Sequence, residues 1–209
     1  MPDNSQDSLT RLFEPKTVAL IGSSKLTETV GMMNPRIYDS IYYNLTKFFD
    51  GEVVKCDIGP DIRNLNSTQL KADLAIIVLS AALANTALEF CGKNGIKAAI
   101  VVPGGFKDVE RSRLIEIASR NKIRVLGPNA IMGVINTENG LNTTFERDLM
   151  PKRGGLSVLS QSGGVGAALA AWATYYGGGI SKFTWLGDKA DISEVDLLEY
   201  LSGDGASKV

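Results

Sequence analysis

Short apolar runs alternate along the chain with longer stretches in which apolar residues recur three and four positions apart. The short runs are rich in Val and Ile and are bounded by Gly, Pro or polar residues, as buried strands are. We expect strands at residues 17–22, 52–56, 73–80, 97–104 and 123–127. The periodic stretches predict helices at residues 34–49, 82–95 and 107–121.

This alternation predicts an α/β fold with a Rossmann-like, doubly wound parallel sheet. Each crossover between parallel strands needs a helix to return the chain. Strands covered on both faces also explain continuous apolar runs rather than strict alternation. We expect this first domain to span residues 1–128.

The alternation of strand-like and helix-like segments starts again after a polar connector at residues 127–154. We expect a strand at 155–160, a helix at 164–179, a strand at 180–187 and a helix at 193–204 whose N-cap is Ser193. Residues 129–209 would then begin a second α/β domain, and the last residues resemble the start of another strand. Because a sheet of two or three strands is a poor independent domain, we expect further chain or a second subunit to complete it.

Composition limits the possible classes of function. The 209 residues include 22 basic and 23 acidic ones with no long block of either sign, so no electrostatic footprint for nucleic acid or an anionic membrane is visible. No apolar run approaches the roughly 18 residues that span a bilayer. The polar N-terminus is unlike a secretory signal, which predicts a cytoplasmic protein.

Two residue types restrict the chemistry further. Cys56 and Cys91 show no C-x-x-C spacing and are interpreted as reduced, partly buried thiols. The chain contains no histidine. A Ser-His-Asp triad, a histidine general base and a His-ligated zinc are therefore excluded on this chain, and we assign it no catalytic residue and no metal site.

Two strand-to-helix turns carry the candidate chemistry. The first, "ALIGSSK", offers the backbone of Gly22, the hydroxyls of Ser23 and Ser24, and the charge of Lys25. Such a turn is a ready anion site, because a helix N-terminus exposes unpaired N–H groups at the ligand edge of the sheet. An ordinary tight turn with capping serines is the alternative. The next glycine is Gly31, which breaks the G-x-G-x-x-G pattern of NAD(P) sites.

The second turn, "SVLSQSGGVG", gathers more donors. Ser160, Gln161, Ser162, Gly163 and Gly164 supply two hydroxyls, an amide and several backbone N–H groups. The alternative is a capped helix whose small residues allow close packing on the sheet.

Several segments together resemble one family. They are "LFEPKTVALIGSS", "DLAIIVLSA", "GIKAAIVVPGGFKD", "RVLGPNAIMGVIN", "GGLSVLSQSGGVG" and "WLGDKADISEVDLLEYLSGD". The resemblance is to the CoA-binding part of the nucleoside-diphosphate-forming acyl-CoA synthetases, which are related to the α subunit of succinyl-CoA synthetase. It covers nearly the whole chain, and G-P-N combined with S-Q-S-G is its most specific feature.

The resemblance implies a Rossmann-like CoA-binding domain, a flavodoxin-like domain and an ATP-grasp partner. The family's reversible acid–thiol ligation passes through a phosphohistidine. Matching positions imply that the CoA site is lined by Gly22, Ser23, Ser24, Lys25, Leu79, Ser80, Ala81, Gly104, Gly105 and Phe106. The phosphohistidine pocket would be bordered by Gly127, Pro128, Asn129, Ser160, Gln161, Ser162 and Gly163.

The sequence departs from the family pattern at four places. Leu79-Ser80-Ala81 replaces valine-proline-alanine, and Gly187-Asp188 replaces glycine-asparagine. Residues 54–60 replace a Tyr-Pro-Val-Asn-Pro segment, which places Asp57 where its charge would repel a phosphate. The active histidine is missing, so a histidine-bearing remainder would have to supply it. A fragment, a split gene and a degenerate homologue each account for its absence, and the strand-like last residues favour a truncated chain.

Three functions follow as hypotheses. The first is the CoA-binding portion of such a synthetase, inactive alone. The second is a non-catalytic CoA or nucleotide sensor, supported by the altered segment after the second strand. The third is an NAD(P)-binding oxidoreductase, which the broken glycine pattern disfavours. The acyl group and the choice of ADP or GDP are not readable from the residues, and an incomplete sheet with an unpaired edge predicts association into an oligomer.

Overall fold

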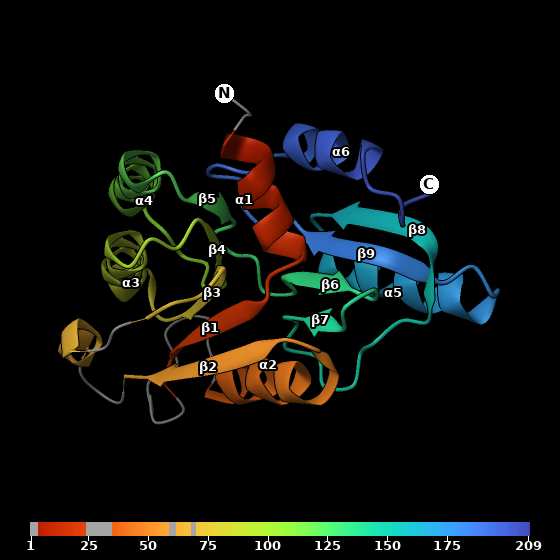
Figure 1. The fold of residues 1–209 in the computed structure, drawn as a ribbon, viewed down its shortest axis with the longest axis horizontal. Helices are drawn as coiled ribbons and strands as arrows, with labels where there is room; N and C mark the ends of the chain where they lie inside the picture. The colour runs from red at the N-terminus through yellow and green to blue at the C-terminus, as the bar shows by residue number, and fades with distance from the viewer. Residues whose placement is uncertain (1–3, 24–34, 59–61, 68–69) are drawn as a thin grey trace.

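Five parallel strands form the first sheet of the computed structural model, which describes residues 4–23, 35–58, 62–67 and 70–209 (Figure 1). Their order across the sheet is β2-β1-β3-β4-β5. The expected strands are present as β1 (Thr17–Gly22), β2 (Glu52–Asp57), β3 (Leu74–Val78), β4 (Ala98–Val101) and β5 (Arg124–Leu126). The prediction of a doubly wound parallel sheet is confirmed.

Helices return the chain between these strands where the periodicity predicts them. They are α2 (Pro35–Phe48), α3 (Ala81–Lys93) and α4 (Asp108–Asn121), with the 3-10 helix η1 (Ile62–Ser67) between β2 and β3. From β1 the chain moves to one side of the sheet to form β2 and then to the other side to form β3. This reversal creates a topological switch point, where folds of this type bind ligands at the carboxyl ends of the strands.

A helix that the sequence expectations do not contain, α1 (Asn4–Phe13), precedes the first strand. The segment reads as polar, yet Leu9, Leu12 and Phe13 are buried in the main core. The ring of Phe13 stacks on that of Tyr200 with 4.8 Å between centroids. The side chain of Asn136 donates a hydrogen bond to the carbonyl oxygen of Phe13 at 2.9 Å. Tertiary contacts, rather than a strong local pattern, hold α1 in place.

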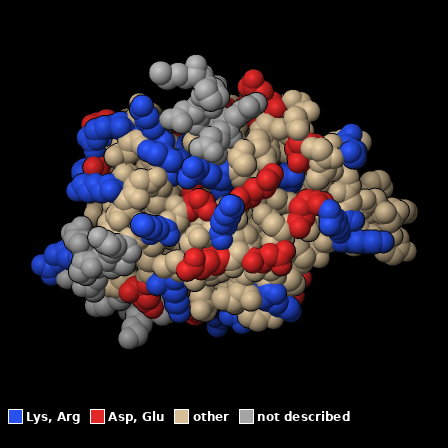
Figure 2. Space-filling view, viewed as in Figure 1, with Lys and Arg blue, Asp and Glu red and all other residues tan. Residues whose placement is uncertain are grey.

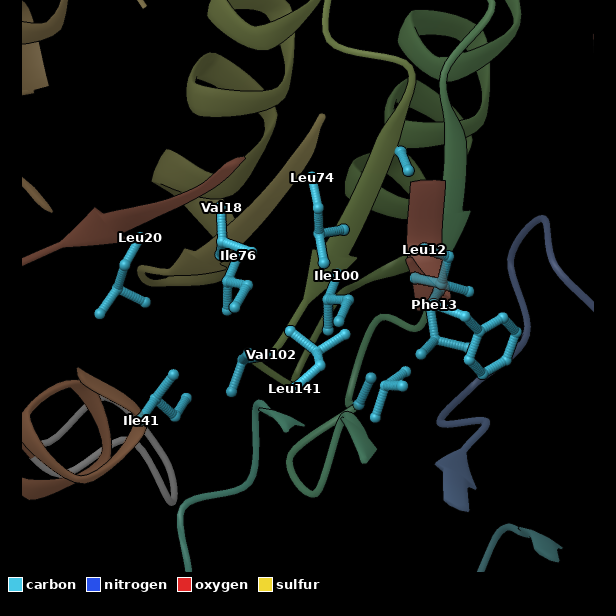
Figure 3. Packing of buried hydrophobic residues seen from close by; sticks show 14 of the residues in the cluster. Leu12, Phe13, Val18, Leu20, Ile41, Leu74, Ile76, Ile100, Val102 and Leu141 are labelled. Atoms are coloured by element: carbon cyan, nitrogen blue, oxygen red, sulfur yellow. The ribbon is translucent and has the colours of Figure 1, made fainter. Parts of the chain in front are cut away.

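Alternate residues of the first sheet enter two different cores, because successive side chains leave a strand on opposite faces. Val18, Leu20 and Ile76 belong to the core that α1 and α2 cover (Figure 3). Ala19 and Ile77 belong to the core that α3 and α4 cover. All five side chains are completely buried, which accounts for the continuous apolar runs in the sequence.

A second sheet of four strands, in the order β7-β6-β9-β8, lies beside the first. Its strands are β6 (Val134–Asn136), β7 (Leu141–Asn142), β8 (Arg153–Ser160) and β9 (Ile180–Trp185). Helix α5 (Gly163–Tyr175) connects β8 to β9, and helix α6 (Glu194–Ser202) follows β9. β8 and β9 are parallel, whereas β6 runs antiparallel to both β7 and β9. Ser193 caps α6 as expected, since its side chain accepts a hydrogen bond from the backbone of Asp196.

The structure differs from three expectations for this part of the chain. Residues 127–154 were predicted to be a connector, but they contain β6 and β7. These strands have three and two residues, too few to produce a recognisable period. The second sheet therefore has four strands rather than two or three. The last residues form no strand, although the backbones of Lys208 and Val209 exchange hydrogen bonds of 2.7–3.2 Å with Gly155 and Ser157 of β8.

One hydrophobic core joins the two sheets. Val134, Leu141, Leu186, Ile192 and Leu197 lie in the same buried cluster as β1, β3 and β4. The segment between β9 and α6 also runs along β5 in the opposite direction, with backbone bonds from Ala190 to Gly127 and from Ile192 to Val125. This pairing covers an edge that would otherwise be open.

A buried ion pair holds the segment that follows α6 against the second sheet. Lys182 of β9 has a side chain only 2% exposed, and its Nζ lies 2.6 Å from a carboxylate oxygen of Asp204. The hydroxyl and backbone N–H of Ser207 donate to the same carboxylate. Burial by itself raises the pKa of Asp204, but the hydrogen bonds from Lys182 and Ser207 outweigh burial and hold that pKa below its ordinary value.

Replacing Asp204 with Asn is expected to lower the free energy of unfolding by about 3 kcal/mol, because the buried ammonium group of Lys182 loses its counter-charge. Urea denaturation at pH 7 measures the change, and Glu199→Gln, which alters an exposed carboxylate of α6, is the matched control.

The same variant has a pH signature. A carboxylate whose pKa is depressed by folding contributes stability above its unfolded pKa, and this contribution is lost as pH falls through the folded pKa. The stability difference between the wild type and Asp204→Asn should therefore shrink below about pH 4. A difference that stays constant down to pH 2 would contradict this account.

Candidate functional site

The turn after β1 lies at the switch point of the first sheet. Gly22 ends β1, and the following Ser23 is buried. A Cβ atom on Gly22 would stand 2.5 Å from the ring of Tyr38 and 2.8 Å from the carbonyl oxygen of Val78. Glycine is therefore needed for this close approach of α2 and β3 to the turn. The other two candidates at this turn, Ser24 and Lys25, lie outside the described residues.

The three candidates after β3 differ in what they can offer a ligand. Leu79 is completely buried in the core shared with α3 and α4, so its side chain serves packing. Ser80 is half-buried and occupies the N-cap position of α3 without making a side-chain capping bond. Ala81 is the first residue of the helix. A ligand would meet the Ser80 hydroxyl and the backbone here.

The loop after β4 approaches the loop after β5. A Cβ atom on Gly104 would lie 2.8 Å from the side-chain oxygen of Asn129, so the two loops touch. Gly105 is exposed and has a φ of +77°. Phe106 is half-buried and packs on the core beneath α3 and α4.

Hydrogen bonds to the loop after β4 and to the loop after β9 hold the G-P-N segment in place. The backbone N–H of Asn129 donates to the carbonyl oxygen of Pro103 at 2.7 Å, and its side-chain amide donates to Asp188 at 3.2 Å. The backbone N–H of Asp188 donates to the carbonyl oxygen of Pro128 at 2.8 Å. Gly127 is buried between these contacts.

The S-Q-S-G segment joins β8 to α5. The Ser160 hydroxyl donates to the carbonyl oxygen of Ser162 at 2.8 Å, and the Ser162 hydroxyl caps α5 by accepting from Val165. The Gln161 side chain donates to the carbonyl oxygen of Gly187 at 3.1 Å. Gly163 lies against the ring of Trp185, where a Cβ atom would be only 1.8 Å away.

The two motifs meet at Gly187 and Asp188. Gln161 binds the carbonyl group of Gly187, while Asn129 and Pro128 bind Asp188. The structure thus brings the candidates after β4, β5 and β8 together, whereas Leu79, Ser80 and Ala81 follow a different strand end. Sequence reasoning noted Gly187-Asp188 only as a departure from the family pattern and missed its bridging position.

The positive end of the α5 helix dipole lies at its N-terminus, and no acidic side chain of the helix compensates it there. Its first turn contains no acidic residue. By contrast, the first turn of α4 carries Asp108 and Glu110, and that of α6 carries Glu194 and Asp196. The first turns of α2 and α3 contain no acidic residue either. A helix N-terminus carries a partial positive charge and unpaired N–H groups, so the first turn of α5 has the electrostatics of an anion site, as those of α2 and α3 do.

A cavity of about 1000 Å³ runs between the first turn of α2 and the first turn of α5. Its walls are mainly apolar, and their charged and hydroxyl side chains, Glu146 and Asp148 among them, come from α2 and the 145–149 loop. They include Arg36, Ser40, Ile131, Met132, Phe145, Arg147, Leu149, Gly163, Gly164 and Trp185. Most of these residues were not among the sequence candidates, because they come from five separate segments and share no motif.

One wall of this cavity is fixed by polar contacts with α2. The guanidinium of Arg147 donates to the Ser40 hydroxyl at 3.3 Å and lies 5.1 Å from the centre of the Tyr43 ring. The neighbouring carboxylate of Asp148 accepts hydrogen bonds from Lys47 and Tyr43, which lower its pKa. The 145–149 loop is thereby anchored with Arg147 on the cavity wall.

Other surfaces offer less chemistry. Both cysteines are free and buried, and burial raises the pKa of each thiol, so both are protonated at neutral pH. Acidic and basic side chains are interspersed over the face drawn in Figure 2. Within the described residues, no group of three His, Cys, Asp or Glu could hold a metal ion. None of the described helices is both long and apolar enough to cross a membrane.

Comparison with known families matches residues 16–136 to a CoA binding domain and residues 153–209 to a succinyl-CoA ligase like flavodoxin domain. The ADP-forming acetate–CoA ligase of Methanocaldococcus jannaschii is 37% identical over 204 residues, covering 93% of this chain and 28% of the relative. The α subunit of ADP-forming acetate–CoA ligase I of Pyrococcus furiosus is 35% identical over 217 residues, covering 94% and 45%.

The fold agrees with a solved structure of the same kind. The dinucleotide forming acetyl-coenzyme A synthetase 1 of Ca. Korarchaeum cryptofilum, in complex with phosphate and ADP, superposes with a TM-score of 0.80 at 30% identity. The match covers 96% of this chain and 44% of that one. The chain spans less than half the length of each of these relatives. It belongs to the CoA binding domain family.

Proposed function

We propose that the chain is the CoA-binding portion of an NDP-forming acyl-CoA synthetase, an acid–thiol ligase that works through a phosphohistidine. The turn after β1 and the loops after β3 and β4 bind CoA, and the two segments that meet at Gly187 and Asp188 border the phosphoryl pocket. The observation that carries the proposal is this meeting of G-P-N with S-Q-S-G beside a cavity that reaches α2.

The arrangement suits a long ligand with phosphates at one end and a thiol at the other. The diphosphate of CoA would lie at the turn after β1, where the backbone of Gly22 and the start of α2 supply donors. The mainly apolar cavity offers the pantetheine arm a path from α2 toward α5. The thiol would then lie near the N-terminus of α5, which stabilises a phosphoryl group by its dipole and N–H groups.

In this proposal the chain binds and positions CoA, but acid–thiol ligation needs other protein parts. It has no histidine, so the phosphoryl carrier must come from a histidine-bearing remainder or partner. An ATP-grasp subunit or domain would exchange the phosphoryl group with the nucleotide. The Pyrococcus furiosus relative is itself an α subunit, which supports assembly with another chain.

A non-catalytic CoA sensor is the second candidate, and the absence of histidine favours it. The two functions differ in what surrounds the chain. A gene that encodes neither the histidine nor an ATP-grasp region would establish the sensor.

The isolated chain is expected to bind CoA saturably and to catalyse no acid–thiol ligation. Isothermal titration calorimetry measures the binding, and an assay for CoA thioester formation with acetate and ATP measures the reaction. Adding a histidine-bearing remainder and an ATP-grasp partner should restore ligation if the chain is a synthetase part. Absence of CoA binding would exclude both candidate functions.

The phosphate pocket can be tested by adding one charge to α5. Gly164 has open space at its Cβ position, so a side chain fits there. Gly164→Asp is expected to raise the stability of the free protein by about 0.5 kcal/mol, since an acid in the first turn complements the helix dipole. Inorganic phosphate is expected to raise the Tm of the wild type, and Gly164→Asp should abolish this increase.

Gly164→Asn is the matched control, because it has the same size without the charge. It should keep the response to phosphate. Equal phosphate responses in the Asp and Asn variants would show that the N-terminus of α5 holds no phosphate.

A further inference from the structure

One side of helix α5 carries large apolar side chains that face solvent. In the described part of the chain, ten large hydrophobic side chains are exposed, and five of them belong to α5 and the residue that follows it. They are Val165, Leu169, Trp172, Tyr175 and Tyr176. The three aromatic ones are 62%, 83% and 68% exposed. These five side chains are the α5 patch.

Four of the five residues form one row along the helix. Their spacing of four, three and four positions, from Val165 to Tyr176, is the spacing of side chains that line the seam of a helix–helix contact. The side of α5 that packs on β8 and β9 is different, because its buried residues are the small Gly166, Ala170 and Ala173. The large side chains of the patch therefore do not serve the core of this chain.

No charge interrupts the α5 patch. The sequence contains no Asp, Glu, Lys or Arg between Arg153 and Lys182. The exposed hydrophobic side chains of α4 and α6, by contrast, lie among charged residues, as in the segment Glu194-Val195-Asp196 of α6. A helix that is apolar on all sides is normally buried. We therefore expect a partner over the outer side of α5.

The patch is large enough for a specific interface. Aromatic side chains bury about 150–250 Å² each, so at their exposure Trp172, Tyr175 and Tyr176 leave about 400 Å² of apolar surface open to solvent. Val165, Leu169 and the small residues between them bring the patch toward the roughly 800 Å² per partner that a specific interface buries. Monomers rarely expose a contiguous apolar patch of this size.

The aromatic rings of the patch contact one another before any partner binds. The ring centres of Trp172 and Tyr176 are 4.9 Å apart, and those of Tyr175 and Tyr176 are 5.1 Å apart in an edge-to-face arrangement. Such contacts restrict the rotamers of these side chains, so less conformational entropy is lost when a partner covers them. Trp and Tyr are also enriched among the residues that dominate binding at the centres of interfaces.

The position of α5 gives a partner access to the patch. The helix lies on one face of the second sheet, and its C-terminal end projects at the right-hand end of the molecule, far from α3 and α4 (Figure 1). The three aromatic residues belong to this end of the helix.

We propose that the α5 patch is the contact through which two copies of this chain form a symmetric dimer. In a contact about a two-fold axis, the same patch serves both copies. A patch without charge suits this arrangement, because no like charges face one another across the axis. A head-to-tail contact needs a second patch, and in the described part of the chain the other exposed hydrophobic side chains lie among the charges of α4 and α6 or at residue 209.

Two α5 helices that run in opposite directions bring their rows together. Because the row is centred between Leu169 and Trp172, an antiparallel pair sets Val165 of each copy opposite Tyr176 of the other. Homodimer interfaces are more apolar than those between proteins that also exist apart, which agrees with the composition of the patch. The dimer goes beyond the proposed function, since the phosphoryl pocket lies at the N-terminal end of α5 and the row runs along its side.

Sedimentation equilibrium of the chain without CoA measures the proposed dimer. The average mass is expected to rise with concentration from 22.4 kDa toward twice that value. Higher salt should not weaken the dimer, because an uncharged contact is not screened. A chain that stays monomeric up to about 100 µM, where even a micromolar complex is almost fully formed, would overturn the proposal.

Trp172→Lys tests whether the patch forms the contact. Lysine is a good helix former, and a cation in the last turn of α5 complements the helix dipole, so the single chain should stay folded. A charge in the middle of the row is expected to weaken dimerisation by about thirtyfold or more, the effect of losing a central aromatic residue. Trp172→Phe should keep most of the affinity. Tyr176→Lys, just beyond the helix, should weaken the dimer as well.

Leu198→Lys is the matched control. It places the same charge at a leucine of α6 that is 58% exposed, and it should leave the dissociation constant unchanged. If Trp172→Lys and Tyr176→Lys are folded by circular dichroism and dimerise as tightly as the wild type, the copies meet elsewhere and the proposal is wrong. Wild-type species larger than a dimer would exclude a closed two-fold contact. These results are independent of CoA binding, which calorimetry tests separately.

Discussion

The backbone contact between Gly187 and Pro128 sets the geometry of the candidate site. A Cβ atom on residue 187 would stand 2.2 Å from the carbonyl oxygen of Pro128, and the φ of +61° is one that side chains disfavour. A glycine here lets the loop after β9 lie directly on the loop after β5. The hydrogen bonds that Gln161 makes to Gly187, and that Asn129 and Pro128 make to Asp188, join G-P-N and S-Q-S-G at this point.

The candidate site carries paired charges near β5 and no acidic side chain at the start of α5. Near the start of β5, Arg124 is paired with Asp191 and Asp196, at 3.1 and 2.8 Å, and these acids also bind backbone or capping groups. That network fastens the segment that runs beside β5. At the other end, α5 begins with glycines and no acid. The charges of this network compensate one another, whereas no acidic side chain in the first turn of α5 compensates the positive end of that helix.

Two residue types limit the chemistry that this chain can offer. Its two thiols are buried and protonated, and it contains no histidine. What the chain offers is a set of backbone donors at strand ends and a mainly apolar cavity. Under the proposed function, this part would hold the thiol substrate while another part would carry the phosphoryl group.

Local patterns determined the first sheet and most helices, because strands buried on both faces and amphipathic helices leave periods long enough to read. They also located Gly22, Ser160 and Ser162 at strand-to-helix turns, since glycine and serine have specific roles there. The sequence did not reveal α1, β6 or β7, whose few apolar residues acquire meaning only when α6 and the two sheets surround them.

Tertiary structure alone decided which turns meet. Asn129, Gln161 and Asp188 are far apart in the chain and come together through backbone packing at Gly187. The cavity walls likewise come from separate segments. A sequence records the chemistry of each side chain, but distances between remote residues arise from how the sheets and helices pack.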